Sequence, residues 1–199
     1  YGAVIRDASR RDASKSIPKQ TIPELLFNVE NTENAWGLTK GIIISAEKVL
    51  LMDISFELIE TIENEISEAI SRGVTVYVKT SQAGNISGCK FITPKMENPE
   101  LTHTPHRWVE LSADSNHYLL ANFKEQQTQV STGIYCKGQK LGYKFHSGLA
   151  HEIMVTQLSK LIENSGDDKL KGQFIELTHE TIWEAGTIEA FEASFGEGN

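Results

Sequence analysis

The chain has 199 residues and a mass of 22.2 kDa, which suits one domain with a small annex. Nineteen Lys and Arg against 27 Asp and Glu give a net charge of −8, which argues against a surface that binds nucleic acid or anionic membranes. No apolar stretch approaches the ~20 residues of a membrane span. The two cysteines, Cys89 and Cys136, stand apart from any Cys and His cluster, so we predict buried thiols in a reducing cytoplasm, with no metal and no cofactor.

The N-terminal segment is expected to be an arm or linker over residues 1–35. Residues 1–5 (YGAVI) suit a short strand, and the charged stretch after them suits a linker. Because proline is tolerated at a first helical position, Pro23 predicts a helical turn over residues 22–29. Residues 31–34 are expected to form a loop.

A strand–helix–strand unit follows. Residues 48–53 (KVLLMD) form a near-continuous apolar run, which is typical of a strand buried on both faces. Ser55 offers an N-cap, and apolar residues recur at helical spacing from there to position 70. Gly73 supplies a left-handed helix end, and residues 74–79 (VTVYVK) predict the second strand. The two strands should therefore be parallel.

The second half of the chain favours further strands and a long helix. Residues 114–116 (DSN) indicate a tight hairpin turn, and Gly138 and Gly142 indicate another turn. Apolar residues at helical spacing from Leu149 predict a helix that ends at the loop 165–168. A strand over 174–177 and a helix over 181–192 are expected in the tail. The other strand-like runs cover residues 90–92, 107–112, 117–122 and 129–136, so the fold class is α/β with a mixed sheet.

No complete nucleotide-binding, nucleophile-elbow or zinc-protease motif is present. The loop 80–87 follows the carboxyl end of a parallel strand, where open α/β sheets usually bind ligands. The densest polar cluster lies between residues 103 and 122. Turn and surface roles stay open for the Asp and Asn side chains there. The candidate ligand-binding residues are Ser81, Asn85, His106, Trp108, Glu110, Asp114 and Asn122.

Residues 46–53 (AEKVLLMD), the helix after them and residues 71–78 (SRGVTVYV) resemble the opening unit of the phospholipase D-like fold. The resemblance covers residues 36–164. It implies that the hairpin 107–122 matches the strands that carry the His-x-Lys motif of active members. Here Trp108 stands two residues after His106 in place of the lysine, and Asp114 falls eight residues after His106 instead of seven. Without the lysine that would hold a phosphate, we expect no enzyme activity and transfer no catalytic residue.

A degenerate, single-copy domain of this kind resembles the effector domain of TrmB-like transcriptional regulators. The resemblance implies a cytoplasmic homodimer that senses a small molecule, often a sugar, and reaches DNA through a winged-helix domain. We expect that domain to precede Tyr1, the effector domain to span residues 36–164 and a C-terminal extension to span residues 165–199. Two alternatives stay open: a divergent phosphodiesterase or nuclease using His106 or His117, and a dimerisation scaffold without a ligand.

Overall fold

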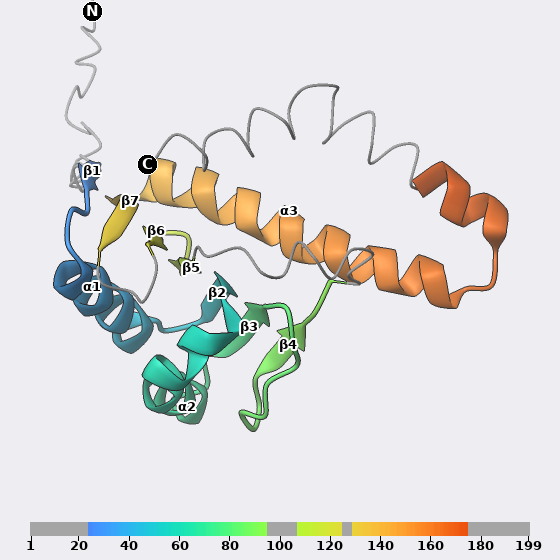
Figure 1. Ribbon diagram of the computed structural model, residues 1–199, viewed down its shortest axis with the longest axis horizontal. Coiled ribbons are helices and arrows are strands. Elements are labelled where there is room, and N and C mark those ends of the chain that lie inside the picture. The colour runs from blue at the N-terminus through green and yellow to red at the C-terminus, as the bar shows by residue number, and fades with distance from the viewer. Residues whose placement is uncertain (1–23, 95–106, 125–128, 175–199) are drawn as a thin grey trace, which may run out of the picture.

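The computed structural model describes residues 24–94, 107–124 and 129–174 (Figure 1). They form one seven-stranded mixed sheet in the order β1-β7-β6-β5-β2-β3-β4, with helices on both faces. The helices are α1 (Thr32–Ser45), the 3-10 helix η1 (Phe56–Ile62), α2 (Glu63–Ser71) and α3 (Gln139–Asn164). The strands are β1 (Leu25–Asn28), β2 (Val49–Ile54), β3 (Thr75–Lys79), β4 (Lys90–Ile92), β5 (Arg107–Ala113), β6 (His117–Phe123) and β7 (Val130–Lys137). The predicted mixed α/β sheet is confirmed.

The predicted strand–helix–strand unit is present, with one correction at its helix. Strands β2 and β3 pair in parallel, and Gly73 ends α2 with a φ of +91°. Ser55 stands before η1, but its Oγ accepts a hydrogen bond from the backbone N–H of Trp108 at 3.0 Å and caps no helix. Ser55 therefore occupies the N-cap position as predicted, but its side chain does not cap η1, because a neighbouring strand uses the hydroxyl.

The N-terminal part of the described chain differs from the sequence prediction. Residues 25–28 form the edge strand β1, which pairs antiparallel with β7, where a helical turn was expected. Residues 31–34 are no loop: Asn31 is the N-cap of α1, and its Oδ1 accepts the N–H of Asn34 at 2.8 Å. Pairing with a strand more than 100 residues away overrides the local preference.

The hairpin prediction is confirmed, whereas the start of α3 is not. Asp114 and Ser115 adopt positive φ angles of 51° and 56° in a tight turn between β5 and β6. Helix α3 begins at Gln139, well before Leu149, and includes Gly142. A Cβ at Gly142 would lie 2.7 Å from the backbone oxygen of Ser115, so this glycine allows close helix packing and marks no turn.

Residues 168–174 are helical, where the prediction placed a strand from residue 174. The rest of that predicted strand, the predicted strand over 1–5 and the predicted helix over 181–192 lie outside the described residues. No helix in the described ranges combines the length and the apolar character needed to cross a bilayer.

The helices divide the molecule into two unlike layers (Figure 1). Helices α1, η1 and α2 cover one face of the sheet and bury a continuous apolar core. That core contains Leu50, Met52, Ile54, Val76, Val78, Leu111, Leu119 and Phe123. Helix α3 crosses the other face, where a small apolar cluster of Leu51, Ile92, Leu149 and Ile153 leaves room for polar side chains.

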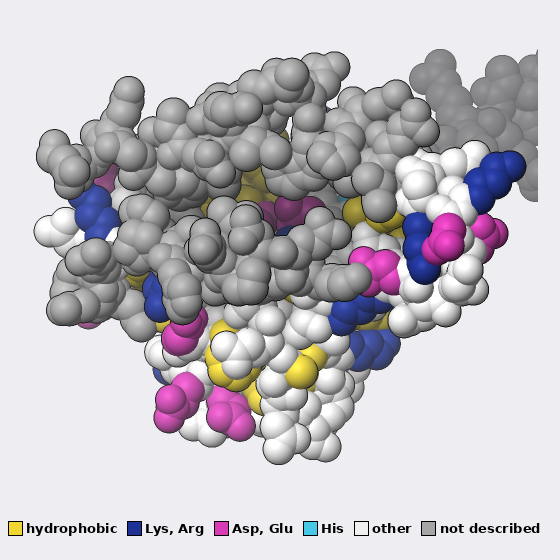
Figure 2. Space-filling model, turned by 45° about the vertical axis from the view of Figure 1, so that its right-hand side comes forward, with side chains coloured by type: hydrophobic (Ala, Val, Ile, Leu, Met, Phe, Trp, Pro, Cys, Tyr) yellow, Lys and Arg dark blue, Asp and Glu magenta, His cyan; other side chains and the backbone are white. Residues whose placement is uncertain are grey.

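The outer surface near α2 is acidic. Figure 2 shows acidic side chains at the lower edge of the molecule, the height at which α2 lies in Figure 1. Glu65 of α2 pairs with Lys40 of α1 at 2.7 Å. The hydrogen bond from Lys40 lowers the pKa of Glu65, so this contact ties α2 to α1 in the charged state.

Both cysteines are free thiols. Cys136 is buried as predicted, whereas Cys89 is half-buried. Burial raises the pKa of Cys89 to about 12 and also raises the pKa of Cys136, so both thiols stay protonated near neutral pH.

Candidate functional site

A pocket of about 160 Å³ opens where the parallel strands β2 and β3 end and the antiparallel strand β5 begins. A cavity of this size accommodates a molecule such as benzene, so the pocket suits one small molecule. Open α/β sheets place ligands at this edge. The pocket is lined by Asp53, Ser55, Phe56, Glu57, Lys79, Thr80, Ser81, Pro94, Arg107 and Trp108.

Trp108 is fixed in place as one wall of the pocket. Its backbone N–H donates to Ser55 Oγ at 3.0 Å, and its backbone oxygen accepts the N–H of Ser55 at 3.0 Å. Its indole Nε1–H donates to Asp53 Oδ1, also at 3.0 Å. Three hydrogen bonds therefore hold the residue, and the indole presents a rigid apolar surface to the pocket.

Asp53 and Lys79 occupy paired positions at the ends of β2 and β3. Lys79 Nζ donates to Asp53 Oδ2 at 2.7 Å and to Glu152 Oε2 of α3 at 3.3 Å. Burial by itself lowers the pKa of Lys79, but the attraction and hydrogen bonds of Asp53 and Glu152 outweigh it and leave the pKa raised. Lys79 is therefore a charged ammonium beneath α3, and both oxygens of Asp53 are engaged.

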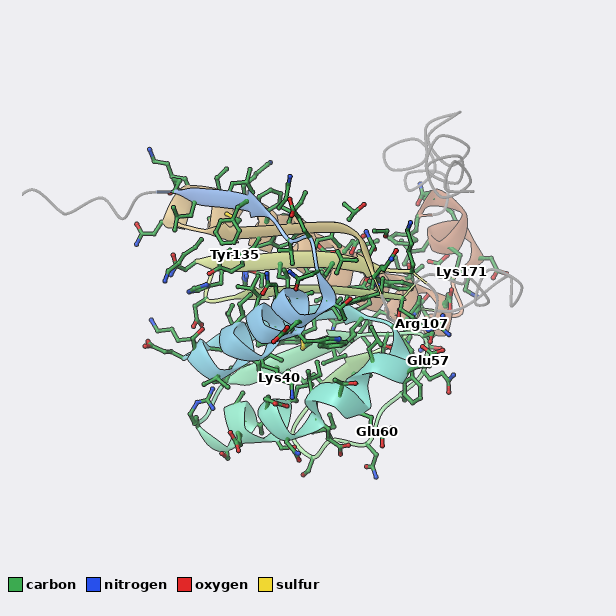
Figure 3. All side chains as sticks on the ribbon, turned by 60° about the vertical axis from the view of Figure 1, so that its left-hand side comes forward. Lys40, Glu57, Glu60, Arg107, Tyr135 and Lys171 are labelled. Atoms are coloured by element: carbon green, nitrogen blue, oxygen red, sulfur yellow. The ribbon has the colours of Figure 1, made fainter. Side chains whose placement is uncertain are left out.

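A second ion pair lies at the rim. Arg107 at the start of β5 and Glu57 of η1 approach to 3.3 Å, and Figure 3 shows the two side by side at one end of the sheet. The two acidic and two basic side chains of the lining thus balance in charge. A pocket with balanced charge favours a ligand with no net charge.

Thr80 carries the most unusual polar atom of the lining. The residue is 2% exposed, and its Oγ1 has no hydrogen-bond partner among the described residues. A buried hydroxyl without a partner costs about 1–3 kcal/mol of stability, so native proteins rarely retain one without a use. Two other such atoms, on Thr32 and Asn116, belong to residues outside the lining.

The structure brings two of the seven predicted candidates, Trp108 and Ser81, into this lining. Asn122 is the β6 residue directly opposite Trp108 in the sheet register. Asn85 is exposed in the loop after β3 and does not line the pocket. His106 lies outside the described residues.

Glu110 lies two residues beyond Trp108 on β5, and its Oε1 accepts a hydrogen bond from Tyr118 Oη at 2.9 Å. Burial raises the pKa of Glu110 to about 7, and the nearby charges of Glu152 and Asp53 act in the same direction. The ring of Tyr118 stacks on Phe145 of α3 at 4.4 Å between centroids. Glu110 therefore lies beneath α3, close to the pocket but not in its lining.

Asp114 lies at the opposite end of β5. Its carboxylate accepts the backbone N–H groups of Glu47, Lys48 and Val49 at 2.7, 2.9 and 2.9 Å. These bonds tie the hairpin turn to the start of β2. The geometry gives Asp114 a structural role away from the pocket.

Sequence reasoning missed Asp53, Lys79, Thr80 and Arg107. A signal was present: opposite charges end two successive strands that are otherwise apolar, and such strands are expected to be neighbours. The contact of Lys79 with Glu152 depends on the position of α3, which the residue pattern did not show.

The fold has relatives among solved structures. Nuc from Salmonella typhimurium, a phospholipase D family member, shares 17% identity over 65% of this chain and 93% of that chain, with a TM-score of 0.50. NucT from Helicobacter pylori shares 15% identity over 65% and 94%, with a TM-score of 0.49. The likeness to Nuc shows a phospholipase D-like fold.

TrmBL2, an archaeal chromatin protein, shares 14% identity over 68% of this chain, with a TM-score of 0.47. The alignment covers 54% of that protein, so this chain spans about half of its length. None of the curated proteins matches the chain in sequence.

The family comparison covers the described core. Residues 25–146 match the N-terminal subdomain of the effector-binding domain (EBD) of the transcriptional regulator TrmB. The match runs from β1 to the start of α3 and includes every residue of the pocket lining. It extends over more than half of the chain. The chain therefore belongs to the family of TrmB transcriptional regulators.

Proposed function

We propose that this chain is the effector-sensing part of a cytoplasmic TrmB-like regulator, and that the pocket at the strand ends binds the effector. The observation that carries the proposal is Thr80 Oγ1, a buried hydroxyl that has no partner within the described part of the chain and belongs to a lining shaped by a fixed indole. A ligand oxygen would give this hydroxyl its partner. Membership of the TrmB family supports a regulatory setting for such a pocket.

The lining favours a neutral, polyhydroxylated ligand such as a sugar. Its charged side chains balance, and hydroxyls of Ser55, Thr80 and Ser81 supply donors and acceptors. Trp108 offers an apolar surface for the C–H face of a ring. Few polar groups within largely apolar walls are typical of small-molecule sites.

A thermal-shift screen tests the proposal with a panel of monosaccharides, disaccharides and sugar phosphates. The wild type is compared with Thr80→Val, which keeps the shape of the side chain and removes the unpartnered hydroxyl. Thr39→Val is the matched control, because Thr39 is equally buried but its hydroxyl donates to the Ala35 oxygen at 2.8 Å.

We expect at least one neutral sugar to raise the Tm of the wild type and of Thr39→Val, but not that of Thr80→Val. Without ligand, Thr80→Val should be more stable than the wild type by about 1 kcal/mol, because no buried hydroxyl is left unpaired. Thr39→Val should be less stable by a similar amount. A panel that leaves the Tm of the wild type unchanged would contradict the proposal.

We also propose that the chain forms a homodimer through α3 and that DNA contact belongs to another domain of the regulator. Apolar side chains stay exposed along α3: Tyr143 at 64%, Met154 at 52%, Leu158 at 41% and Leu161 at 68%. Their helical spacing supports a continuous contact surface, and such exposure is typical of a protein interface. Sedimentation should show a dimer at micromolar concentration and a monomer for Leu161→Glu; a monomeric wild type would contradict this.

The proposal assigns no catalytic step. Trp108, held by Asp53 and Ser55, occupies the position where the phospholipase D-like resemblance implies a lysine. His117 lies at the hairpin end of β6, where its Nδ1 is 2.9 Å from Tyr135 Oη and away from the pocket. We expect no hydrolysis of bis(p-nitrophenyl) phosphate. Hydrolysis lost in His106→Ala or His117→Ala would favour the enzyme instead.

A further inference from the structure

Helix α3 is attached to the sheet by several separate contacts. Leu149 and Ile153 join the small apolar cluster on this face. His146 Nδ1 lies 3.0 Å from Ser112 Oγ, and Lys160 Nζ donates to Thr93 Oγ1 at 2.7 Å. Glu152 accepts from Lys79 at 3.3 Å. These contacts hold the helix at points spread along its length.

The Glu152 contact differs from the others because it continues into the pocket lining. Lys79 also donates to Asp53 at 2.7 Å, and the other oxygen of Asp53 accepts the indole N–H of Trp108 at 3.0 Å. Four side chains from β5, β2, β3 and α3 thus form one hydrogen-bonded series. We call these four residues, Trp108, Asp53, Lys79 and Glu152, the Trp108–Glu152 series.

We propose that Asp53 and Lys79 are positioning residues that couple the indole wall of the pocket to the docking of α3 through Glu152. Asp53 and Lys79 each bond to two other side chains of the series. A change at one of these two bonds therefore alters the strength of the second bond. The side chains of Asp53 and Lys79 are only 11% and 18% exposed, so solvent compensates such changes little at this inner pair, whereas Glu152 is 57% exposed at the outer end. The series thereby links pocket occupancy to the position of α3.

This inference rests on the proposed function for its biological use, because a ligand must enter the pocket to act on Trp108. The coupling itself is a property of the free protein. By thermodynamic reciprocity, anything that weakens the hold of α3 on Lys79 also alters the hold of Asp53 on the indole. It can therefore be measured without a ligand.

A double-mutant cycle on the full chain tests the coupling. Trp108→Phe keeps an aromatic wall and removes the indole N–H, whereas Glu152→Gln keeps the length of the side chain and removes its charge. Thr93→Val is the matched control, because it removes a different polar contact of α3, the bond from Lys160. The readout is native-state amide hydrogen exchange over residues 139–164, measured for each single and double variant.

We expect Trp108→Phe to lower the protection of α3 amides about fivefold or more, the lower end of typical coupling. The same substitution should have little effect in the Glu152→Gln background and its full effect in the Thr93→Val background. Asp53→Asn, which retains an acceptor for the indole, should lower α3 protection as well.

Equal effects of Trp108→Phe in the wild-type, Glu152→Gln and Thr93→Val backgrounds would overturn the proposal. They would show that Trp108 and Glu152 contribute independently to the protection of α3. No effect of Trp108→Phe on α3 in any background would overturn it too. Because no ligand is added, this experiment can fail while sugars still raise the Tm, and it can succeed when none does. Failure of the coupling and failure of the proposed function are therefore distinguishable.

Discussion

The two faces of the same sheet serve different purposes. Beneath α1, η1 and α2, strands β2, β3, β5 and β6 contribute fully buried aliphatic side chains, such as Leu50, Val76, Leu111 and Leu119. Beneath α3, the alternate positions of these strands carry Asp53, Lys79, Glu110 and Tyr118. Side chains on a strand alternate between the two faces, so one set of strands can support both layers.

The difference between the apolar and the polar face of the sheet separates the residues that stabilise the fold from those that determine specificity. An apolar layer gains free energy from burial in any well-packed arrangement. A polar layer under a helix gains little net free energy, but it requires particular partners at particular distances. We therefore expect the α1 and α2 face to dominate stability and the α3 face to determine ligand binding and response to pH.

The largest expected effect on stability comes from truncating one of two neighbouring leucines that lie on opposite faces of the sheet. Leu119 is 0% exposed in the main core, whereas Leu120 is half-buried on the α3 face. Leu119→Ala should lower the free energy of unfolding by about 4 kcal/mol through lost burial and a cavity, and Leu120→Ala by less than half of that. Urea denaturation measures both. Equal losses of unfolding free energy in the two variants would contradict the idea that the α1 and α2 face dominates stability.

The next effect concerns pH and Glu110. Burial raises its pKa from 4.5 to about 7, so the folded state binds this proton more tightly than the unfolded chain does. The contribution of Glu110 to stability is complete below pH 4.5 and is lost as the pH rises through 7, a total of about 3 kcal/mol.

Glu110→Gln should remove this contribution to the pH dependence. Urea denaturation of both proteins between pH 4 and pH 8 measures it as the wild-type free energy of unfolding minus that of the variant. We expect this difference to fall as the pH rises. A difference that stays constant over the range would mean that Glu110 is not a buried, proton-binding group.

The smallest effect tests the end of β5 remote from the pocket. Asp114→Ala removes the acceptor of three backbone N–H groups and places alanine at a φ of 51°, so stability should fall by about 2 kcal/mol. Asp114→Asn keeps one oxygen and tolerates this φ, so its loss should be smaller. Neither variant should change the Tm shift produced by a sugar; if Asp114→Ala abolishes that shift, Asp114 belongs to the ligand site.

Much of the fold could be predicted because its information is local. The apolar runs of β2 and β3, the glycine between them and the residues of the hairpin turn carry their own structural preference. The start of α3 carries no such signal. The carboxylate of Glu24 accepts the N–H groups of Lys140 and Leu141 at 3.0 Å, a cap supplied from more than 100 residues away.

For the candidate site, the sequence predicted the location but not most of the residues that line it. The rule that ligands bind at the carboxyl ends of parallel strands pointed to the loop after β3, and Trp108 and Ser81 line the pocket found there. The sequence gives no signal for the hydroxyl of Thr80, because its lack of a partner among the residues that the structure describes is a property of packing. Asp114 lies in the dense polar cluster of the sequence, which does not show that its carboxylate accepts three backbone N–H groups at the start of β2.

The most direct test of the account is the NMR signal of the Trp108 indole N–H, assigned with Trp108→Phe, during titration with the sugar that gives the largest Tm shift. Occupation of the pocket should move this signal saturably while the indole signal of Trp36, stacked on Phe123 in the other layer, stays in place. A stationary Trp108 signal at sugar concentrations that raise the Tm would contradict the assignment of the effector to this pocket.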